Sequence, residues 1–373
     1  MKVMTIVGTR PEIIRLARVM ARLESTEGIE HVLVHTGQNY DRQLNEVFFD
    51  ELGVRAPDHY LGVDTTSLGS LLGGVLIGTE KALLEERPDA VLVLGDTNSC
   101  LATVMAKRMR IPTYHMEAGN RCFDENVPEE VNRRLVDHVA DFNLAYTEHA
   151  RRNLLAEGLH PRRVMVTGSP MREVLDHYRA EILNADVLAR LGLQTGEYFL
   201  VSAHREENVD SPARLRALLA CLRRVSADYD LPIVVSTHPR TRKRLKALGE
   251  TVDGDVRWLD PFGFFDYNHL QLNAKCVLSD SGTISEESAI LGFPAITLRD
   301  SIERPEALDA GAIMMTGLDP DDVVRAIAVV TGEEPSSMPE GYDVSDTSAR
   351  VVRFMLSTAS RHHAWAGIRT GGV

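Results

Sequence analysis

Cysteines and the common glycine-rich cofactor motifs are scarce in this sequence. The four cysteines, Cys100, Cys122, Cys221 and Cys276, are widely scattered and form no C-x-x-C pair. This spacing argues against a disulfide framework or a zinc site and favours buried thiols in a reducing compartment. The chain also contains no G-x-G-x-x-G and no Walker sequence, which argues against nicotinamide and ATP sites. We therefore expect neither a cofactor nor a metal.

Long apolar runs and an excess of basic charge are also missing. No stretch approaches the ~18 apolar residues of a membrane span, and the apolar run after Lys2 ends at Gly8, too early for a signal-peptide core. With 41 basic and 54 acidic residues, the formal net charge is -13. That balance argues against binding to nucleic acid or to an anionic membrane. We expect a cytoplasmic protein that holds any anionic substrate with a few placed arginines.

Short apolar runs alternate with helical patterns along nearly the whole chain. A length of 373 residues, 44% of them hydrophobic, suits two domains of ordinary size. The predicted strands are 3–7, 31–35, 90–94, 113–116, 142–146, 164–166, 198–202, 233–236, 256–259, 277–278 and 295–298. Continuous apolar strands separated by helices indicate parallel sheets covered on both faces. The predicted fold class is therefore α/β, with doubly wound sheets.

The boundary between the two predicted domains lies near the middle of the chain. The sequence TGSP at 167–170 interrupts the pattern, and the alternation of strands and helices restarts at Tyr198. We expect an N-terminal domain over residues 1–168 and a C-terminal domain over residues 169–347.

Polar residues that follow the first-domain strands are candidates for chemistry, because ligands of open parallel sheets bind beyond the carboxyl ends of strands. Arg10 lies in such a turn and suits a phosphate, although an ordinary turn with a solvated arginine has the same pattern. Asp96 and Glu117 each follow a strand, and Asp96 also fits a helix cap. Glu129 begins a helix, where an acid also complements the helix dipole.

The second domain has basic and small residues at equivalent places. His204 and Arg205 follow a strand and suit a leaving phosphate, although a satisfied surface histidine fits as well. In the sequence SDSGTISEE at 279–287, a strand leads through a turn of small residues into a helix, which presents N–H groups to a phosphate. Glu287 of that helix suits ribose hydroxyls. His238 opens a basic segment that a solvated helix start also explains.

Taken in order, these motifs resemble those of the non-hydrolysing UDP-N-acetylglucosamine 2-epimerase family. The resemblance runs from GTRPE at 8–12 to ERPEA at 303–307. It implies a glycosyltransferase-B fold, in which two Rossmann-like domains flank an interdomain cleft, and usually a homodimer. It also implies that the C-terminal domain binds UDP, that a C-terminal helix at about 348–373 packs back on the N-terminal domain, and that a UDP-sugar is the substrate.

The resemblance also assigns roles to individual residues. It implies that the catalytic residues are Asp96, Glu117, Glu129 and His204. It implies that the nucleotide sugar is bound by Arg10, Arg15, Arg133, Ser281, Gly282 and Glu287, with Arg205 as a further phosphate ligand and Thr283 in the phosphate turn.

The sequence departs from the best-known family members at several positions. Arg15 replaces a lysine, Thr283 replaces the second glycine of the phosphate turn, and GQNYD at 37–41 replaces a glutamine–histidine–arginine stretch. These changes resemble a branch that forms UDP-N-acetyl-L-fucosamine from its 2-epimer.

The altered stretch also bears on regulation. Several bacterial members bind a second UDP-N-acetylglucosamine beside the active site, and their histidine and arginine there align with Asn39 and Tyr40. The resemblance therefore implies that Gln38, Asn39 and His238 form only a remnant of that second site.

The predicted reaction inverts C2 of a UDP-linked N-acetylhexosamine. The expected course is anti-elimination of UDP, formation of a 2-acetamidoglycal and re-addition, which converts UDP-N-acetylglucosamine to UDP-N-acetylmannosamine or acts on a 6-deoxy-L-sugar analogue. Three alternatives stay open: a UDP-sugar glycosyltransferase, which shares the fold and the UDP site, a hydrolysing 2-epimerase, and a catalytically silent nucleotide-sugar sensor.

Overall fold

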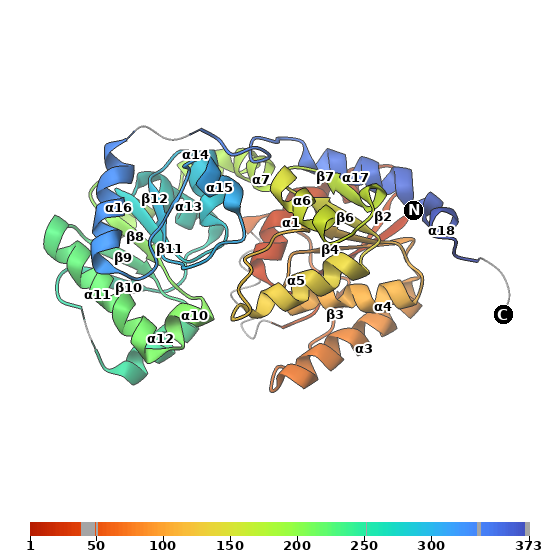
Figure 1. The fold of residues 1–373 in the computed structure, drawn as a ribbon, viewed down its shortest axis with the longest axis horizontal. Coiled ribbons are helices and arrows are strands. Elements are labelled where there is room, and N and C mark those ends of the chain that lie inside the picture. The colour runs from red at the N-terminus through yellow and green to blue at the C-terminus, as the bar shows by residue number, and fades with distance from the viewer. Residues whose placement is uncertain (39–48, 50, 251, 334–336, 370–373) are drawn as a thin grey trace. The chain divides into compact units, whose positions relative to one another are not determined.

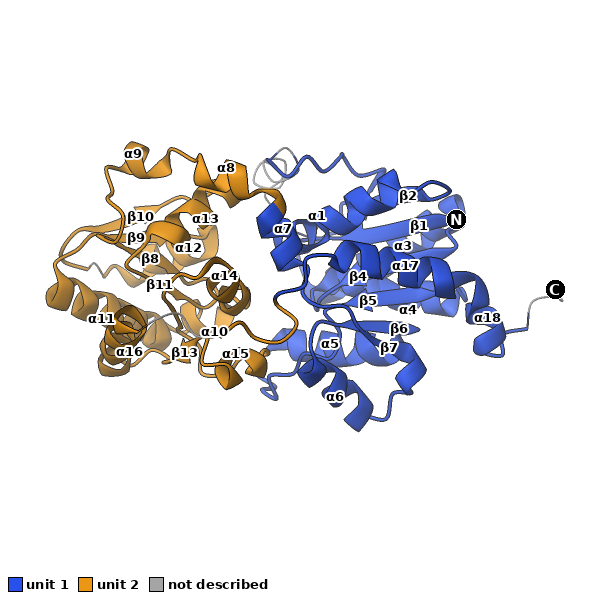
Figure 2. Ribbon diagram, turned by 90° about the horizontal axis from the view of Figure 1, so that it is seen from above, with its two compact units in different colours: residues 1–176, 343–373 blue, residues 177–342 orange. Residues whose placement is uncertain are grey.

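Two parallel sheets organise the chain. The structure is a computed structural model and describes residues 1–38, 49, 51–250, 252–333 and 337–369. Its two compact units are Met1–Asp176 with Asp343–Val373 (unit 1) and His177–Tyr342 (unit 2), coloured separately in Figure 2. Each sheet belongs to one unit.

Unit 1 contains a seven-stranded sheet in the order β3-β2-β1-β4-β5-β6-β7, with all its pairs parallel. Its edge strands β3 and β7 are labelled in Figure 1. Its strands are β1 Lys2–Val7, β2 Glu30–His35, β3 His59–Tyr60, β4 Ala90–Leu94, β5 Thr113–Met116, β6 Phe142–Ala145 and β7 Val164–Val166. Its helices are α1 Arg10–Ser25, α3 Leu68–Glu86, α4 Ala102–Arg108, α5 Pro128–Val139, α6 Glu148–Ala156, α7 Met171–His177, α17 Thr347–Thr358 and α18 His362–Trp365. Short 3-10 turns lie at Asn98–Leu101, Pro161–Arg163 and Ala359–Arg361.

Unit 2 contains a six-stranded parallel sheet in the order β10-β9-β8-β11-β12-β13. Its strands are β8 Phe199–Ser202, β9 Ile233–Ser236, β10 Val256–Leu259, β11 Cys276–Ser279, β12 Ala295–Thr297 and β13 Met314–Met315. Its helices are α8 Arg179–Leu183, α9 Val187–Leu191, α10 Glu206–Val209, α11 Pro212–Tyr229, α12 Pro239–Leu248, α13 Phe264–Asn273, α14 Ile284–Leu291, α15 Pro305–Asp309 and α16 Pro320–Gly332.

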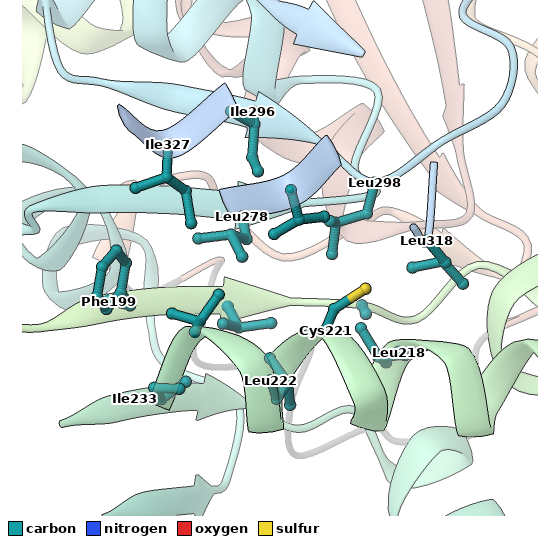
Figure 3. Packing of buried hydrophobic residues seen from close by; sticks show 14 of the residues in the cluster. Phe199, Leu218, Cys221, Leu222, Ile233, Leu278, Ile296, Leu298, Leu318 and Ile327 are labelled. Atoms are coloured by element: carbon teal, nitrogen blue, oxygen red, sulfur yellow. The ribbon is translucent and has the colours of Figure 1, made fainter. Parts of the chain in front are cut away.

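The apolar strands of unit 2 form a core with the helices that cover them. Figure 3 shows Leu218 and Leu222 of α11, and Ile327 of α16, packed with Leu278 and Ile296 of the sheet. All five are 0–1% exposed. Strands with this continuous apolar character are stable only when both faces are covered, as the sequence pattern indicated.

The order of the strands confirms the predicted fold class of two Rossmann-like, doubly wound α/β domains. In both units the strand order reverses beside the first strand of the unit, which creates a switch point at the carboxyl edge of the sheet. The strand predictions missed β3 and β13. Each has two residues and lies at a sheet edge, so neither has a long enough apolar run to be recognised.

The C-terminal helix α17 packs within unit 1, beside α1 and the sheet (Figure 2). The backbone N–H of Ser348 donates to Glu173 Oε2 at 2.7 Å. The hydroxyl groups of Tyr114 and Thr358 share a hydrogen bond at 2.7 Å, and the Phe354 ring lies edge-on to Tyr114 with ring centroids 6.2 Å apart. Helix α17 therefore returns the chain to the sheet of unit 1.

His35 is a buried titratable group at the carboxyl end of β2. It is 1% exposed and stacks on Tyr60 with ring centroids 5.3 Å apart. Its Nδ1 accepts the N–H of Gly37 at 3.0 Å, so this nitrogen is unprotonated in the folded chain. Burial lowers the pKa of His35 from 6.5 to about 4, because the charged imidazolium loses its hydration.

We predict that His35 makes the fold sensitive to mild acid. The pKa of His35 is lower in the folded chain than in the unfolded chain. Its contribution to the free energy of unfolding is therefore fully present above pH 6.5 and is lost as the pH falls toward 4. The share of His35 in the loss between pH 7 and pH 5 should be about 2 kcal/mol. Urea unfolding of the wild type and of His35→Asn, which keeps an acceptor for Gly37, measures it. If the wild type and His35→Asn lost the same free energy of unfolding between pH 7 and pH 5, His35 would not be the source of the acid sensitivity.

Candidate active site

A buried glutamate, Glu12, fixes the turn between β1 and α1. Its Oε2 accepts the backbone N–H groups of Gly8 at 2.6 Å and Thr9 at 2.7 Å. Its Oε1 accepts the hydroxyls of Thr97 at 2.7 Å and Ser99. Burial raises the pKa of this carboxyl, against the effect of the hydrogen bonds. The turn that carries Arg10 is thereby tied to the turn that follows Asp96.

Gly8 is the position in this turn at which a side chain has no room. A Cβ built there would lie 2.3 Å from Thr36 Oγ1 and 2.9 Å from the Gln38 amide. The close approach of the β1 and β2 ends therefore requires glycine.

Asp96 lies in the turn after β4 and is held by Arg133 of α5. The guanidinium donates to Asp96 Oδ2 from Nη2 at 2.6 Å and from Nε at 3.1 Å. Arg133 also donates to Glu130 at 2.5 Å, and Asn132 donates to the Asp96 carbonyl at 2.9 Å. The N-cap of the following 3-10 turn is Thr97, so the aspartate does not have the capping role that its sequence position also allowed.

Glu117 lies just beyond β5 in a backbone conformation that few residues adopt. Its φ is 64°, in the left-handed region, which costs a non-glycine residue of order 1–3 kcal/mol and is frequent at functional sites. Arg15 of α1 donates to Glu117 Oε2 at 2.8 Å, and its guanidinium carbon lies 5.8 Å from the Tyr146 ring centroid. Arg15, expected to bind the nucleotide sugar, therefore lies against a candidate acid.

Glu129 is the second residue of α5 and is half-buried. It lies one turn before Arg133, the residue that reaches Asp96. All three candidate acids thus belong to turns or helix starts at the carboxyl edge of the unit 1 sheet, in line with the general position of ligands in such sheets.

In unit 2, a buried aspartate holds the candidate histidine. Asp280 is 0% exposed and accepts the backbone N–H groups of His204 and Arg205, each at 3.0 Å, and the side-chain amide of Asn208 at 3.1 Å. His204 Nδ1 lies 3.3 Å from Asp280 Oδ1. This contact favours a proton on Nδ1, which leaves Nε2 as the nitrogen for proton exchange or for donation to a ligand.

The turn between β11 and α14 brings cationic groups close to a glycine. The guanidinium of Arg304 donates to the Gly282 carbonyl. A Cβ on Gly282 would lie 3.1 Å from Arg304 Nη1 and 3.3 Å from Arg205 Nη2. Ser281 and Thr283 share a hydroxyl hydrogen bond at 2.9 Å. Two arginines beside half-buried turn backbone make an arrangement suited to a diphosphate.

Glu287 lies on the first turn of α14 and is 8% exposed. Its Oε2 accepts the amide of Gln271 from α13 at 2.7 Å. This bond fixes the carboxylate in the first turn of α14, just after the turn at 281–283.

Of the residues predicted as the remnant of a second site, Gln38 has its contacts in unit 1 and His238 has its contacts in unit 2. Gln38 donates from Nε2 to Thr97 Oγ1 at 3.0 Å in unit 1. His238 caps α12 in unit 2, where its Nδ1 accepts the N–H of Arg240 at 3.2 Å, and its ring centroid lies 6.1 Å from that of His204. Asn39 and Tyr40 lie outside the described residues.

Sequence reasoning missed Glu12, Asp280 and Arg304 as functional residues. Glu12 has a visible signal, because Thr9 followed three residues later by glutamate is the pattern of a capping box, which the structure contains. Asp280 and Arg304 have no comparable local signal, since their contacts join segments 22 to 76 residues apart.

The described part of the chain contains neither a candidate metal cluster nor a candidate membrane span. No group of three or more histidine, cysteine, aspartate or glutamate side chains there is arranged to hold a metal ion. No helix among the same residues is long and apolar enough to cross a membrane.

The two doubly wound units define an enzyme of the glycosyltransferase-B structural class. The model of the family described as UDP-N-acetylglucosamine 2-epimerase matches residues 21–356. The chain belongs to this family, and it is therefore an isomerase.

Individual relatives agree with this assignment over nearly their whole length. A structure of UDP-N-acetylglucosamine 2-epimerase from Rickettsia bellii has a TM-score of 0.92 and 44% identity, covering 99% of this chain and 100% of that one. The Methanocaldococcus jannaschii enzyme in complex with UDP-GlcNAc and UDP has a TM-score of 0.90 and 35% identity, covering 96% and 100%. The UDP-2,3-diacetamido-2,3-dideoxy-D-glucuronate 2-epimerase of Pseudomonas aeruginosa is 32% identical over 95% of this chain and 99% of its own.

Proposed function

We propose that this protein inverts C2 of a UDP-linked N-acetylhexosamine without net hydrolysis. The observation that carries the proposal is the set of three acids, Asp96, Glu117 and Glu129, at the carboxyl edge of the unit 1 sheet, two of them held by the buried guanidinium groups of Arg133 and Arg15. Family membership supports the same reaction class.

The chemistry explains why more than one acid is needed. The C2 hydrogen of a pyranoside is not alpha to a carbonyl, so cleavage of the C1–O bond has to accompany or precede its removal. Loss of UDP creates positive character at C1, a carboxylate takes the C2 proton, and a 2-acetamidoglycal remains. Inversion requires the proton to return to the opposite face before UDP adds again. Two differently placed acid–base groups are therefore expected.

Unit 2 is proposed to bind the UDP leaving group. Arg205 and Arg304 beside Gly282 would stabilise the diphosphate as negative charge develops on it. Ser281 and Thr283 supply hydroxyl groups, and Glu287 accepts from the ribose. Arg10, in the first turn of α1, is proposed as a further diphosphate ligand. His204, oriented by Asp280, donates a hydrogen bond or a proton to the departing diphosphate.

The natural sugar is proposed only as a class. The relatives include proteins named for UDP-N-acetylglucosamine and one named for a diacetamido-glucuronate, so the family scaffold accepts different substituents on the ring. UDP-N-acetylglucosamine is the first candidate, and the 6-deoxy-L-sugar branch indicated by residues 37–41 stays a prediction.

We predict that enzyme in deuterated water exchanges the C2 hydrogen of its UDP-sugar for deuterium while the 2-epimer accumulates, as followed by proton NMR. Asp96→Asn, Glu117→Gln and Glu129→Gln should each lower kcat by at least ~10²-fold, the usual scale for acid–base groups. UDP affinity should change little, because its proposed ligands lie mainly elsewhere. Glu148→Gln, an ordinary first-turn acid of α6, is the control and should keep wild-type kcat.

Two results would contradict the epimerase. Retention of protium at C2, with turnover seen only after an acceptor sugar is added, would indicate a glycosyltransferase. Irreversible release of free UDP and a free amino sugar would indicate a hydrolysing relative.

We further propose that no second UDP-sugar is needed for activity. Asn39 is uncharged where family members carry histidine, and loss of one charge-assisted contact typically costs ~1.5–3 kcal/mol, or about ten- to a hundredfold in affinity. The amide nitrogen of Gln38 already donates to Thr97. Gln38, His238 and Arg240 are expected to compensate only in part.

We therefore predict hyperbolic kinetics and one nucleotide sugar per subunit in titration calorimetry, with no requirement for added UDP-N-acetylglucosamine. Restoring the family residue with Asn39→His should move the rate curve toward a sigmoid if the remnant site is otherwise intact. A sigmoidal curve in the wild type, or two bound UDP-sugars per chain, would overturn this proposal.

We also propose a homodimer that uses α3. Ile77 and Leu84 lie two turns apart on the same side of this helix and are 71% and 60% exposed. Exposed apolar side chains gathered on one helix face are typical of protein–protein contacts. The helix is apolar on its other side as well, where Val75 and Leu83 are buried.

We predict that Ile77→Lys shifts the protein from dimer toward monomer in sedimentation equilibrium, because a buried lysine without a partner is costly. Leu183→Lys, at a residue of α8 that is 53% exposed, is the matched control and should leave the distribution unchanged. If both variants kept the wild-type distribution of monomer and dimer, α3 would not form the dimer interface.

A further inference from the structure

Asp137 is a buried carboxylate that the proposed mechanism does not use. It lies near the end of α5 and is 0% exposed, as is its neighbour His115. Arg121, at 2% exposed, is its cationic partner, with Nη1 donating to Asp137 Oδ2 at 2.7 Å. The same arginine donates to Glu157 at 2.8 Å from Nε and at 2.6 Å from Nη2.

The Asp137 carboxylate touches the Glu117 turn on both sides of the candidate acid. Two residues after Glu117, the backbone N–H of Gly119 donates to Asp137 Oδ2 at 3.1 Å. Two residues before it, His115 Nδ1 lies 2.9 Å from Asp137 Oδ1, a close contact without the geometry of a hydrogen bond. One carboxylate therefore spans the segment that carries Glu117.

This segment needs such support because its backbone is strained. Glu117 has a φ of 64° and Gly119 a φ of 85°. A Cβ at Gly119 would lie 2.3 Å from the carbonyl oxygen of Ala150, so the turn is pressed against α6. A left-handed non-glycine residue persists only where its surroundings over-determine it.

The same network extends to the turn before Asp96. On the other side of its ring, His115 Nε2 lies 2.7 Å from the carbonyl oxygen of Gly95 and donates to it. Gly95 is also left-handed, with a φ of 76°, and Asp96 follows it directly. Asp137 is thus connected through a single imidazole to the second acid-bearing turn.

A role in fold stability alone is a weak explanation for this arrangement. Burying a carboxylate and a guanidinium is costly, and apolar residues of similar volume often stabilise as well or better. The contacts instead converge on two short turns whose geometry the reaction depends on. A displacement of about 1 Å in a catalytic group typically costs ~10²-fold in rate.

We propose that Asp137 is a positioning residue for the reaction, holding Glu117 directly and Asp96 through His115. The inference rests on the proposed acid–base roles of Glu117 and Asp96. It assigns to Asp137 no contact with substrate.

The experiment compares Asp137→Asn with Asp141→Asn. Asp141 is also buried, at 5% exposed, and accepts the N–H and hydroxyl of Thr113 at 3.1 and 3.0 Å and an ammonium from Lys107. It lies at the opposite end of β5 from Glu117. Both variants should lower the Tm, but only Asp137→Asn should lower kcat by ~10²-fold with KM and UDP affinity within about threefold.

A double-mutant cycle separates positioning from general destabilisation. If Asp137 acts through Glu117, then Asp137→Asn should cost less than about threefold in kcat when added to Glu117→Gln, because the positioned group is already absent. His115→Gln is the second variant, should Asp137→Asn fail to fold, and is expected to lower kcat by at least ~10-fold with KM unchanged.

The outcomes distinguish this inference from the proposed function. If Glu117→Gln is slow, but Asp137→Asn and His115→Gln are as fast as Asp141→Asn, the positioning role is wrong and the acid–base assignment stands. Full additivity in the cycle would also overturn the positioning role. Wild-type kcat in Glu117→Gln would instead overturn the proposed function on which the inference rests.

Discussion

Backbone N–H groups in the turns at the sheet edges donate to carboxylates that have almost no exposed surface. Glu12 accepts from Gly8 and Thr9, Asp137 from Gly119, and Asp280 from His204 and Arg205. In each case the turn also carries a residue proposed to act on the nucleotide sugar. A buried charge is tolerated only when its hydrogen-bonding capacity is filled. The turns are therefore held in one geometry by the requirement to satisfy the carboxylate beneath them.

Two sets of ionisable residues have different roles in this arrangement: the candidate catalytic acids and the buried carboxylates that support the turns. Two of the acids proposed to act on the substrate are partly exposed and paired with an arginine, Asp96 with Arg133 and Glu117 with Arg15. The supporting carboxylates Glu12, Asp137 and Asp280 accept several donors each, and each accepts from at least one backbone N–H. Charge-assisted bonds to backbone N–H groups are stronger than neutral ones, so the support is rigid. Preorganised groups need little rearrangement when charge develops in the reaction.

The fold could be predicted from sequence because parallel strands are buried on both faces and therefore read as continuous apolar runs. The order of those runs also fixes a doubly wound topology. The two-residue strands β3 and β13 could not be found, since their pairing depends on the strand beside them. Strand pattern thus identifies the centre of each sheet better than its edge.

For the candidate site, the sequence predicted which turns carry the functional residues but not which residues support those turns. Motif position placed Asp96, Glu117 and His204 at strand ends, where the structure has them. It did not reveal Asp280 or Asp137 as their supports, because an aspartate after a strand or within a helix has the same local sequence whether it is buried or solvated. Only the contact between distant segments separates the two, as in the 76 residues between His204 and Asp280.

The hydroxyl of Thr97 has a single hydrogen, and this gives the contacts around it a direction. It donates that hydrogen to Glu12 and accepts one from the amide of Gln38. The amide nitrogen of Gln38 must then face Thr97, and its oxygen must face the other way. An ionised Glu12 is therefore compatible with only one of the two amide orientations of Gln38 at the end of β2. If Glu12 were neutral and donated to Thr97, the Thr97 hydrogen would turn to the amide oxygen of Gln38, so the two orientations differ by one proton on Glu12.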